Sequence, residues 1–160
     1  GILIIEGIYS FNEKLTEIIP NKNKYKVYAS TFTPLAIDNH NMFKQEDVRL
    51  LRRIVRNKLL SSIPANITLS KIEEIRNESR TIFKYIDDAD FIINTSLVYE
   101  LSVLKTYVEP LLFSVEELDE NYEEAIRLIN LFRVILGIPS EEVPNDSALR
   151  EFIGGSCFKY

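Results

Sequence analysis

A set of arginines in the stretch DVRLLRRIVRNKLL has the spacing of an anion-binding surface. The four residues stand at i, i+3, i+4 and i+7, which places them on one face of a helix. They are Arg49, Arg52, Arg53 and Arg56. The opposite face carries Leu51, Ile54 and Val55. Because like charges at this spacing repel each other by roughly 0.2–0.5 kcal/mol per pair, we expect anionic groups to face the arginines.

Two kinds of anion suit this arginine face. One is a set of side-chain carboxylates, for example those of the segment KIEEIRNES at residues 71–79, and this interpretation takes precedence when the residues are considered alone. The other is phosphate, which planar guanidinium groups bind through two parallel hydrogen bonds and whose charge they stabilise during transfer. Both interpretations remain open at this point.

The elements that must position these arginines alternate between strand and helix. Residues 2–5 form a continuous run of branched aliphatic residues and predict a buried parallel strand, with Glu6 at its carboxyl end, where such strands present ligand contacts. Residues 24–30 and the segment ADFIINTS at 89–96 predict two more strands.

The predicted helices lie between and after these strands, and the connection 31–43 has the composition of a structured loop. The helical ranges are 12–18, 67–84, 97–112 and 121–137, together with a segment of at least a dozen residues that begins at Glu46. In 97–112 the helical spacing of apolar residues continues up to Pro110, and Gly137 is expected as the C-cap of the last helix. Strands separated by helices indicate an α/β protein with a short parallel sheet of about three strands. With 160 residues, we expect a single domain over 1–160.

Composition excludes several classes of partner. The net charge of -5 argues against a general nucleic-acid or membrane-surface binder. No segment has the roughly 20 apolar residues of a membrane span, and no signal peptide is evident. Cys157 is the single cysteine, which favours a reducing compartment, and we expect a cytoplasmic protein in which this side chain is packed.

Six segments, spread in order over nearly the whole chain, resemble one enzyme family. They are ILIIEGIYSFNEKL, KYKVYAS, IDNHN, DVRLLRRIVRN, ADFIINTSLVYELSVLKTYVEPLL and SALREFIGGSCFKY. Together they resemble the C-terminal half of a bacterial uridine kinase-like nucleoside kinase of the phosphoribulokinase/uridine kinase family. The resemblance implies a P-loop kinase fold that transfers the γ-phosphate of ATP, with Mg²⁺, to the 5'-hydroxyl of a uridine-like nucleoside.

The resemblance also implies roles for individual residues. Glu6 matches an acidic residue near Mg²⁺, with a salt-bridging or helix-capping acid as the alternative. Arg53 and Arg56 match catalytic arginines of the lid helix that face the substrate and ATP phosphates. Arg52 is expected either to bind ATP together with Arg56 or, together with Arg49, to hold the lid in place through ion pairs.

Two further motifs match the family. Asp38 and His40, followed by Asn41, lie in the family's DxHN loop as candidate substrate contacts, although an exposed loop histidine is an equal alternative. Gly154 and Gly155 match the terminal REFIGGS, where a tight turn with positive φ is sufficient explanation.

The printed sequence contains no Walker A motif, G-x-x-x-x-G-K-[ST], since its glycines stand at 1, 7, 137, 154 and 155. We therefore expect a C-terminal part of the kinase domain, inactive alone and without bound ATP or Mg²⁺, whose partner is the Walker A half. An exposed sheet edge would also favour self-association. Some positions depart from the family: Asn57, Ser61 and Ser62 in the lid, and Met42, which replaces a basic residue after the DxHN loop. A kinase-derived binding or regulatory module without catalysis is the alternative.

Overall fold

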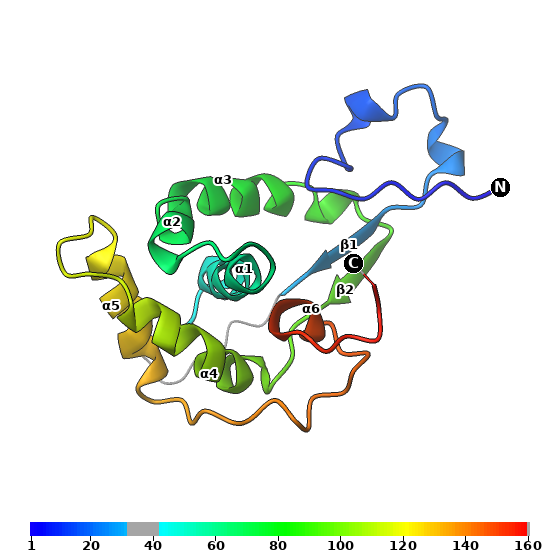
Figure 1. Ribbon diagram of the computed structural model, residues 1–160. Coiled ribbons are helices and arrows are strands. Elements are labelled where there is room, and N and C mark those ends of the chain that lie inside the picture. The colour runs from blue at the N-terminus through cyan, green and yellow to red at the C-terminus, as the bar shows by residue number, and fades with distance from the viewer. Residues whose placement is uncertain (32–41, 160) are drawn as a thin grey trace.

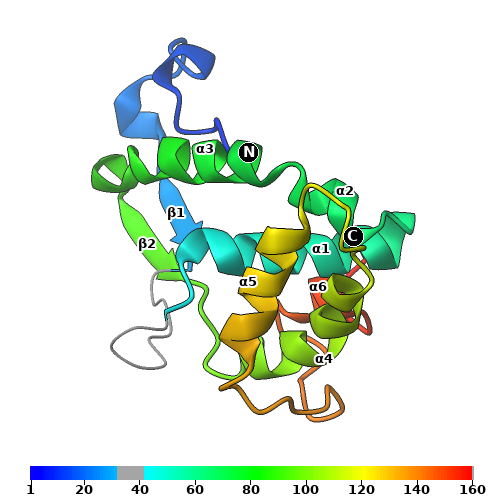
Figure 2. The same cartoon turned by 90° about the vertical axis from the view of Figure 1, so that its left-hand side faces the viewer.

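The computed structural model describes residues 1–31 and 42–159. The candidate residues Asp38, His40 and Asn41 lie outside these ranges. The described part is an α/β structure in which a small parallel sheet lies to one side of a group of helices (Figures 1 and 2). The fold class predicted from the sequence is confirmed at this level.

Two short strands form the sheet within the described residues. β1 (Val27–Ser30) pairs in parallel with β2 (Phe91–Asn94), in a register that sets Val27 opposite Phe91 and Ser30 opposite Asn94. Both strands lie within the ranges predicted from the sequence. The segment between them is largely helical, as a crossover between parallel strands requires.

The predicted strand at residues 2–5 is wrong. These residues are extended but form no ladder with a described strand, and Ile2, Leu3, Ile4 and Ile5 are 95%, 76%, 84% and 51% exposed. A strand is defined by hydrogen bonds to a neighbour, and the apolar run does not supply one by itself. The described sheet consequently has two strands rather than about three.

Six α-helices occur in the described part of the chain. They are α1 (Gln45–Ser61), α2 (Ala65–Leu69), α3 (Ile72–Phe83), α4 (Glu100–Phe113), α5 (Tyr122–Phe132) and α6 (Arg150–Ile153). Short 3₁₀ turns lie at Glu13–Leu15, Asn21–Asn23 and Ile86–Asp88, the first within the helix predicted at 12–18. The charged helix predicted over 67–84 is divided between α2 and α3.

Helix α1 is the centre of the helical part. It packs against α2, α3, α4 and α6, and Figure 1 shows it surrounded by them. Its apolar face is buried as the spacing predicted, with Leu51, Ile54 and Val55 at most 3% exposed. The arginine face of α1 is therefore the side directed toward the charged groups of its neighbours.

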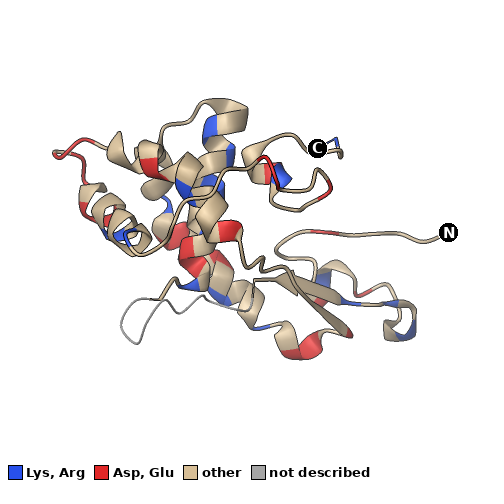
Figure 3. Ribbon diagram, turned by 90° about the horizontal axis from the view of Figure 1, so that it is seen from below, with Lys and Arg blue, Asp and Glu red and all other residues tan. Residues whose placement is uncertain are grey.

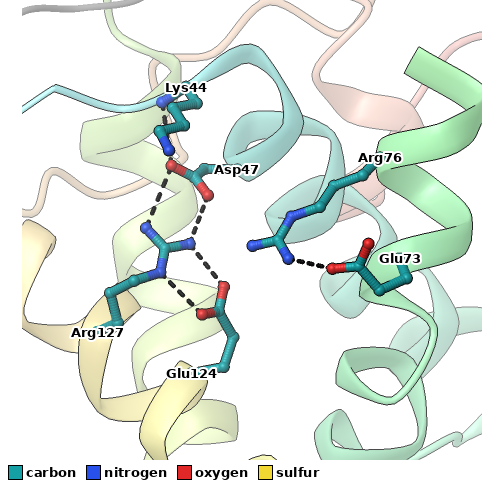
Figure 4. Close-up of polar contacts among 6 residues, drawn as sticks. All are labelled: Lys44, Asp47, Glu73, Arg76, Glu124 and Arg127. Carbon is teal, nitrogen blue, oxygen red and sulfur yellow. Dashed lines mark hydrogen bonds and ion pairs between the residues drawn. The ribbon is translucent and has the colours of Figure 1, made fainter. Parts of the chain in front are cut away.

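A charge cluster fixes the start of α1 (Figure 4). The Asp47 carboxylate accepts a hydrogen bond of 3.0 Å from the backbone N–H of Lys44, one half of a capping box. Arg127 of α5 donates to Asp47 and also to Glu124, at 2.6 Å from its Oε1. These hydrogen bonds, led by those to Glu124, raise the pKa of Arg127. The cluster joins the N-terminus of α1 to α5.

Helix α5 ends earlier than the sequence predicted. Its last residue is Phe132, and Gly137 is not its C-cap. The Lys105 ammonium group from α4 donates to the carbonyl oxygens of Phe132, the last residue of α5, and of Ile135 just beyond it, both at 2.8 Å. A cation from another helix thus replaces the local glycine cap.

Two smaller expectations are corrected by the structure. Helix α4 continues through Pro110 to Phe113, held by its buried residues Val108 and Leu112. Cys157 is exposed rather than packed. Among the described residues, no helix has the length and apolar character needed to cross a membrane.

Candidate functional site

Arg49 and Arg53, the first and third arginines of the α1 face, share one carboxylate. Arg53 Nη2 lies 2.9 Å from Glu78 Oε2 of α3, and Arg49 Nη2 lies 3.8 Å from the same oxygen. Glu78 belongs to the segment 71–79 that the sequence offered as a carboxylate source. The ion-pair interpretation is therefore confirmed for Arg53, and Arg49 has only a distant charge partner.

Arg52 forms the most buried of these pairs. Its guanidinium group donates to both carboxylate oxygens of Glu100 at the start of α4, with Nη2 2.7 Å from Oε2. The side chains are 15% and 4% exposed. The Phe152 ring lies 5.1 Å from the guanidinium carbon, a cation–π distance. Arg52 thus joins α1 to α4 and α6.

Arg56 pairs with the tail of the chain. Its Nη1 lies 2.9 Å from Glu151 Oε1 of α6, and both side chains are more than 30% exposed. Figure 3 shows positive and negative segments close together among these helices. Because three of the four arginines have a close carboxylate, much of the charge of this face is neutralised within the chain.

Sequence reasoning missed two of these carboxylates. Glu100 is 3% exposed, and the signal that could have identified it is an acid within an otherwise apolar helical segment. Glu151 is separated from Arg56 by 95 residues, and no local pattern indicates that contact. Gly154 and Gly155 adopt φ of 85° and 75°, which confirms the tight turn expected at the end of α6.

A cavity of about 460 Å³ lies between the N-terminal segment and β1. Glu6 and Arg49, from opposite ends of the first fifty residues, both line it. The rest of its wall is mainly apolar and aromatic, and consists of Ile4, Ile5, Gly7, Ile8, Ser10, Phe11, Val27, Tyr28, Ala29, Ile82 and Tyr85. The structure thus brings Glu6, the candidate metal ligand, and Arg49, the first arginine of the α1 face, to one cavity.

Arg49 is the most unusual charge in this cavity. Its Nε is buried and has no hydrogen-bond partner among the described residues. Burial lowers the pKa of Arg49, and the Glu78 charge only partly opposes this effect. The side chain as a whole is 27% exposed, so an anion or acceptor that reaches the guanidinium group would stabilise it.

The aromatic side of the cavity is ordered by ring contacts. The Phe11 ring lies 6.2 Å from the rings of both Tyr28 and Tyr85, with an interplanar angle of 84° to Tyr28. Burial also raises the pKa of Tyr28. Neither tyrosine was singled out as a site residue by the sequence. Tyr28 is an alternating aromatic residue in a strand, which is typical of ordinary packing, and Tyr85 follows the end of α3.

Glu6 fits a magnesium site in one respect. Mg²⁺ is commonly held by one or two carboxylates together with water and substrate phosphates, so a single exposed carboxylate beside a cavity is an acceptable ligand. The described residues contain no group of three or more metal-binding side chains. Any metal held here would consequently depend on ligands from a bound phosphate and water.

Comparison of this chain with protein-family models, with curated proteins and with solved structures finds no match.

Proposed function

We propose that this chain is the C-terminal part of an ATP-dependent nucleoside kinase, with uridine as the expected substrate. The observation that carries the proposal is the shared cavity, because it sets the Glu6 carboxylate and the Arg49 guanidinium around one space. Phosphoryl transfer depends on a metal held by carboxylates and on cations that stabilise the phosphate charge. The six resembling segments supply the choice of kinase family.

Four of the candidate residues would each have a defined task in this reaction. When bound, Mg²⁺ would neutralise the phosphate oxygens, and Glu6 would hold it. Arg53 and Arg56 would orient the phosphates, after exchanging their present partners Glu78 and Glu151 for the substrate. Arg52 would keep α1 attached to α4 through Glu100 and would contribute charge rather than contact.

The reaction also needs a Walker A element, which the 160 residues do not contain. A polypeptide that unites these residues with a Walker A element is therefore the enzyme to assay, with radiolabelled ATP, Mg²⁺ and each common nucleoside. We expect phosphate transfer to the 5'-hydroxyl of a pyrimidine nucleoside. No transfer to any nucleoside would reject the kinase proposal.

A non-catalytic module is the second candidate. The observation in its favour is that Arg52, Arg53 and Arg56 already have carboxylate partners within 3 Å. The departure at Asn57 points the same way, since its side chain donates to the Thr68 hydroxyl of α2 and so serves packing. Nucleotide binding without turnover in the same assay would support this second function.

A further inference from the structure

The cavity beside β1 has the size and the lining of a site for a small organic molecule. Its volume of about 460 Å³ lies in the range that such ligands fill. The wall comes from the N-terminal segment, β1, α1 and the end of α3 (Figure 1), and most of its side chains are aliphatic or aromatic. A ligand that fills this space must therefore present an apolar body to the wall.

Arg49 is the single basic residue among the described residues that line the cavity. Its ion pair with Glu78 is long, at 3.8 Å, and the same carboxylate oxygen lies 2.9 Å from Arg53. The buried Nε of Arg49 has no hydrogen-bond partner among the described residues. A guanidinium group presents a planar fork of donors that matches a carboxylate. Arg49 thus has donors left for one anionic group of a ligand.

The composition of the wall favours a carboxylate on an apolar body over free phosphate. Phosphate carries more charge and is bound where several donors converge, whereas one guanidinium group among apolar side chains suits a monoanion. The rings of Phe11, Tyr28 and Tyr85 form one side of the wall, with Phe11 6.2 Å from each of the other two. A flat ring of the ligand would pack against them.

We propose that this cavity binds a small aromatic monocarboxylate, with its carboxylate on the Arg49 guanidinium group and its ring against the aromatic side of the wall. Glu6 also lines the cavity, but its side chain is exposed, so water weakens its repulsion of the ligand. The site goes beyond the proposed function, because it needs neither Mg²⁺ nor a Walker A element. In an assembled kinase this ligand would compete with phosphate for Arg49.

Three indole compounds that differ in charge test the site on the full 160-residue chain. Indole-3-propionate carries a carboxylate, tryptamine carries an ammonium group, and 3-methylindole carries neither. We expect indole-3-propionate to shift the backbone amide NMR signals of residues 4–11 and 27–29 saturably, with a Kd of about 0.1–1 mM. The other two compounds should bind at least about tenfold more weakly, because they do not use the donors of Arg49.

Matched variants locate the carboxylate and the ring. Arg49→Gln should weaken binding of indole-3-propionate at least about tenfold, whereas Arg80→Gln, at an exposed residue of α3 outside the cavity, should leave it unchanged. Ala29→Leu fills cavity space from an exposed position of β1, and it should weaken binding of both indole-3-propionate and 3-methylindole. Circular dichroism of each variant verifies that it is folded.

Glu6→Gln separates this site from the proposed kinase site. It removes a charge that repels the ligand, so the affinity for indole-3-propionate should stay equal or rise. A metal-binding role of Glu6 predicts a loss of kinase activity in the same variant. No nucleotide, Mg²⁺ or Walker A element is present in the binding experiments, so the cavity site stands or fails independently of kinase activity.

Several outcomes would overturn the proposal. Equal affinity for indole-3-propionate and tryptamine, or an unchanged affinity in Arg49→Gln, would show that Arg49 does not hold the carboxylate. An absence of saturable binding up to about 10 mM, or signal shifts confined to residues away from the cavity, would show that the site does not exist. Tighter binding of inorganic phosphate than of indole-3-propionate would show that the ligand needs no apolar body.

Discussion

The arginines of α1 differ in how deeply their ion pairs are buried. Arg52 and Glu100 are almost enclosed, whereas Arg56 and Glu151 are both more than 30% exposed. Removal of one member of a buried pair leaves an uncompensated charge, while an exposed pair is replaced by water at little cost. The same residue type on one helix face therefore serves structure at one position and remains available for a ligand at another.

Alanine substitution should separate these roles. We expect Arg52→Ala to lower the free energy of unfolding by about 3–5 kcal/mol, because Glu100 stays buried without its partner. Arg56→Ala should lower it by no more than about 1 kcal/mol. Urea denaturation followed by circular dichroism measures both. Equal losses for the two variants would contradict this division.

At the scale of the elements, long-range charge contacts fix the ends of the helices. The N-terminus of α1 depends on Asp47, which is buried and joined to Arg127 of α5 (Figure 4). The end of α5 depends on Lys105 of α4. Because α1 carries the arginine face, these contacts determine where its guanidinium groups lie relative to the sheet.

Asp47→Asn tests this anchoring. The substitution removes the charge that Arg127 meets and should lower the free energy of unfolding by about 1–3 kcal/mol. Glu73→Gln is the control, because its pair with Arg76 is an exposed contact within one helix and should change stability by at most about 0.5 kcal/mol. Thermal or urea denaturation compares the two. A loss for the control as large as for Asp47→Asn would contradict the anchoring role.

A second element-scale contact holds the N-terminal segment close to β1. Glu13 accepts hydrogen bonds from Lys24, at 2.6 Å, and from Lys26, and these lower the pKa of Glu13 from 4.5 to about 2. Since the folded pKa is depressed, the stabilisation is complete above pH 4.5 and is lost as the pH falls through about 2.

The titration of the Glu13 carboxyl carbon by NMR measures this tether. We expect a midpoint near 2, and Lys26→Gln should shift the midpoint upward because it removes one of the two donors. A midpoint near 4.5 in the unsubstituted chain would show that the N-terminal segment is not tied to the lysines in solution.

At the scale of the whole molecule, the sequence predicted the α/β class, both strands of the described sheet and the long helix α1. It also placed the apolar and the arginine faces of α1 correctly, because periodicity depends only on neighbours in the chain. It failed for residues 2–5, where strand formation depends on a partner, and for the end of α5, where Lys105 comes from another helix. Contacts between distant residues have no local signature.

The candidate site follows the same rule. The spacing of the arginines predicted their common face, and the segment 71–79 contained the carboxylate that faces Arg53. Glu100, Glu151 and the tyrosines of the cavity were not predicted, because only the packing of the helices brings them to the site. The meeting of Glu6 and Arg49 at one cavity is likewise a product of the tertiary structure.

The most direct test of the account is the dependence of nucleoside phosphorylation on Glu6. In the polypeptide that unites these residues with a Walker A element, we expect Glu6→Gln to lower kcat by at least about tenfold and to raise the Mg²⁺ concentration required. Glu17→Gln, at an exposed residue that does not line the cavity, should leave both unchanged. Equal kcat and equal Mg²⁺ dependence in the two variants would contradict the claim that Glu6 belongs to a phosphoryl-transfer site.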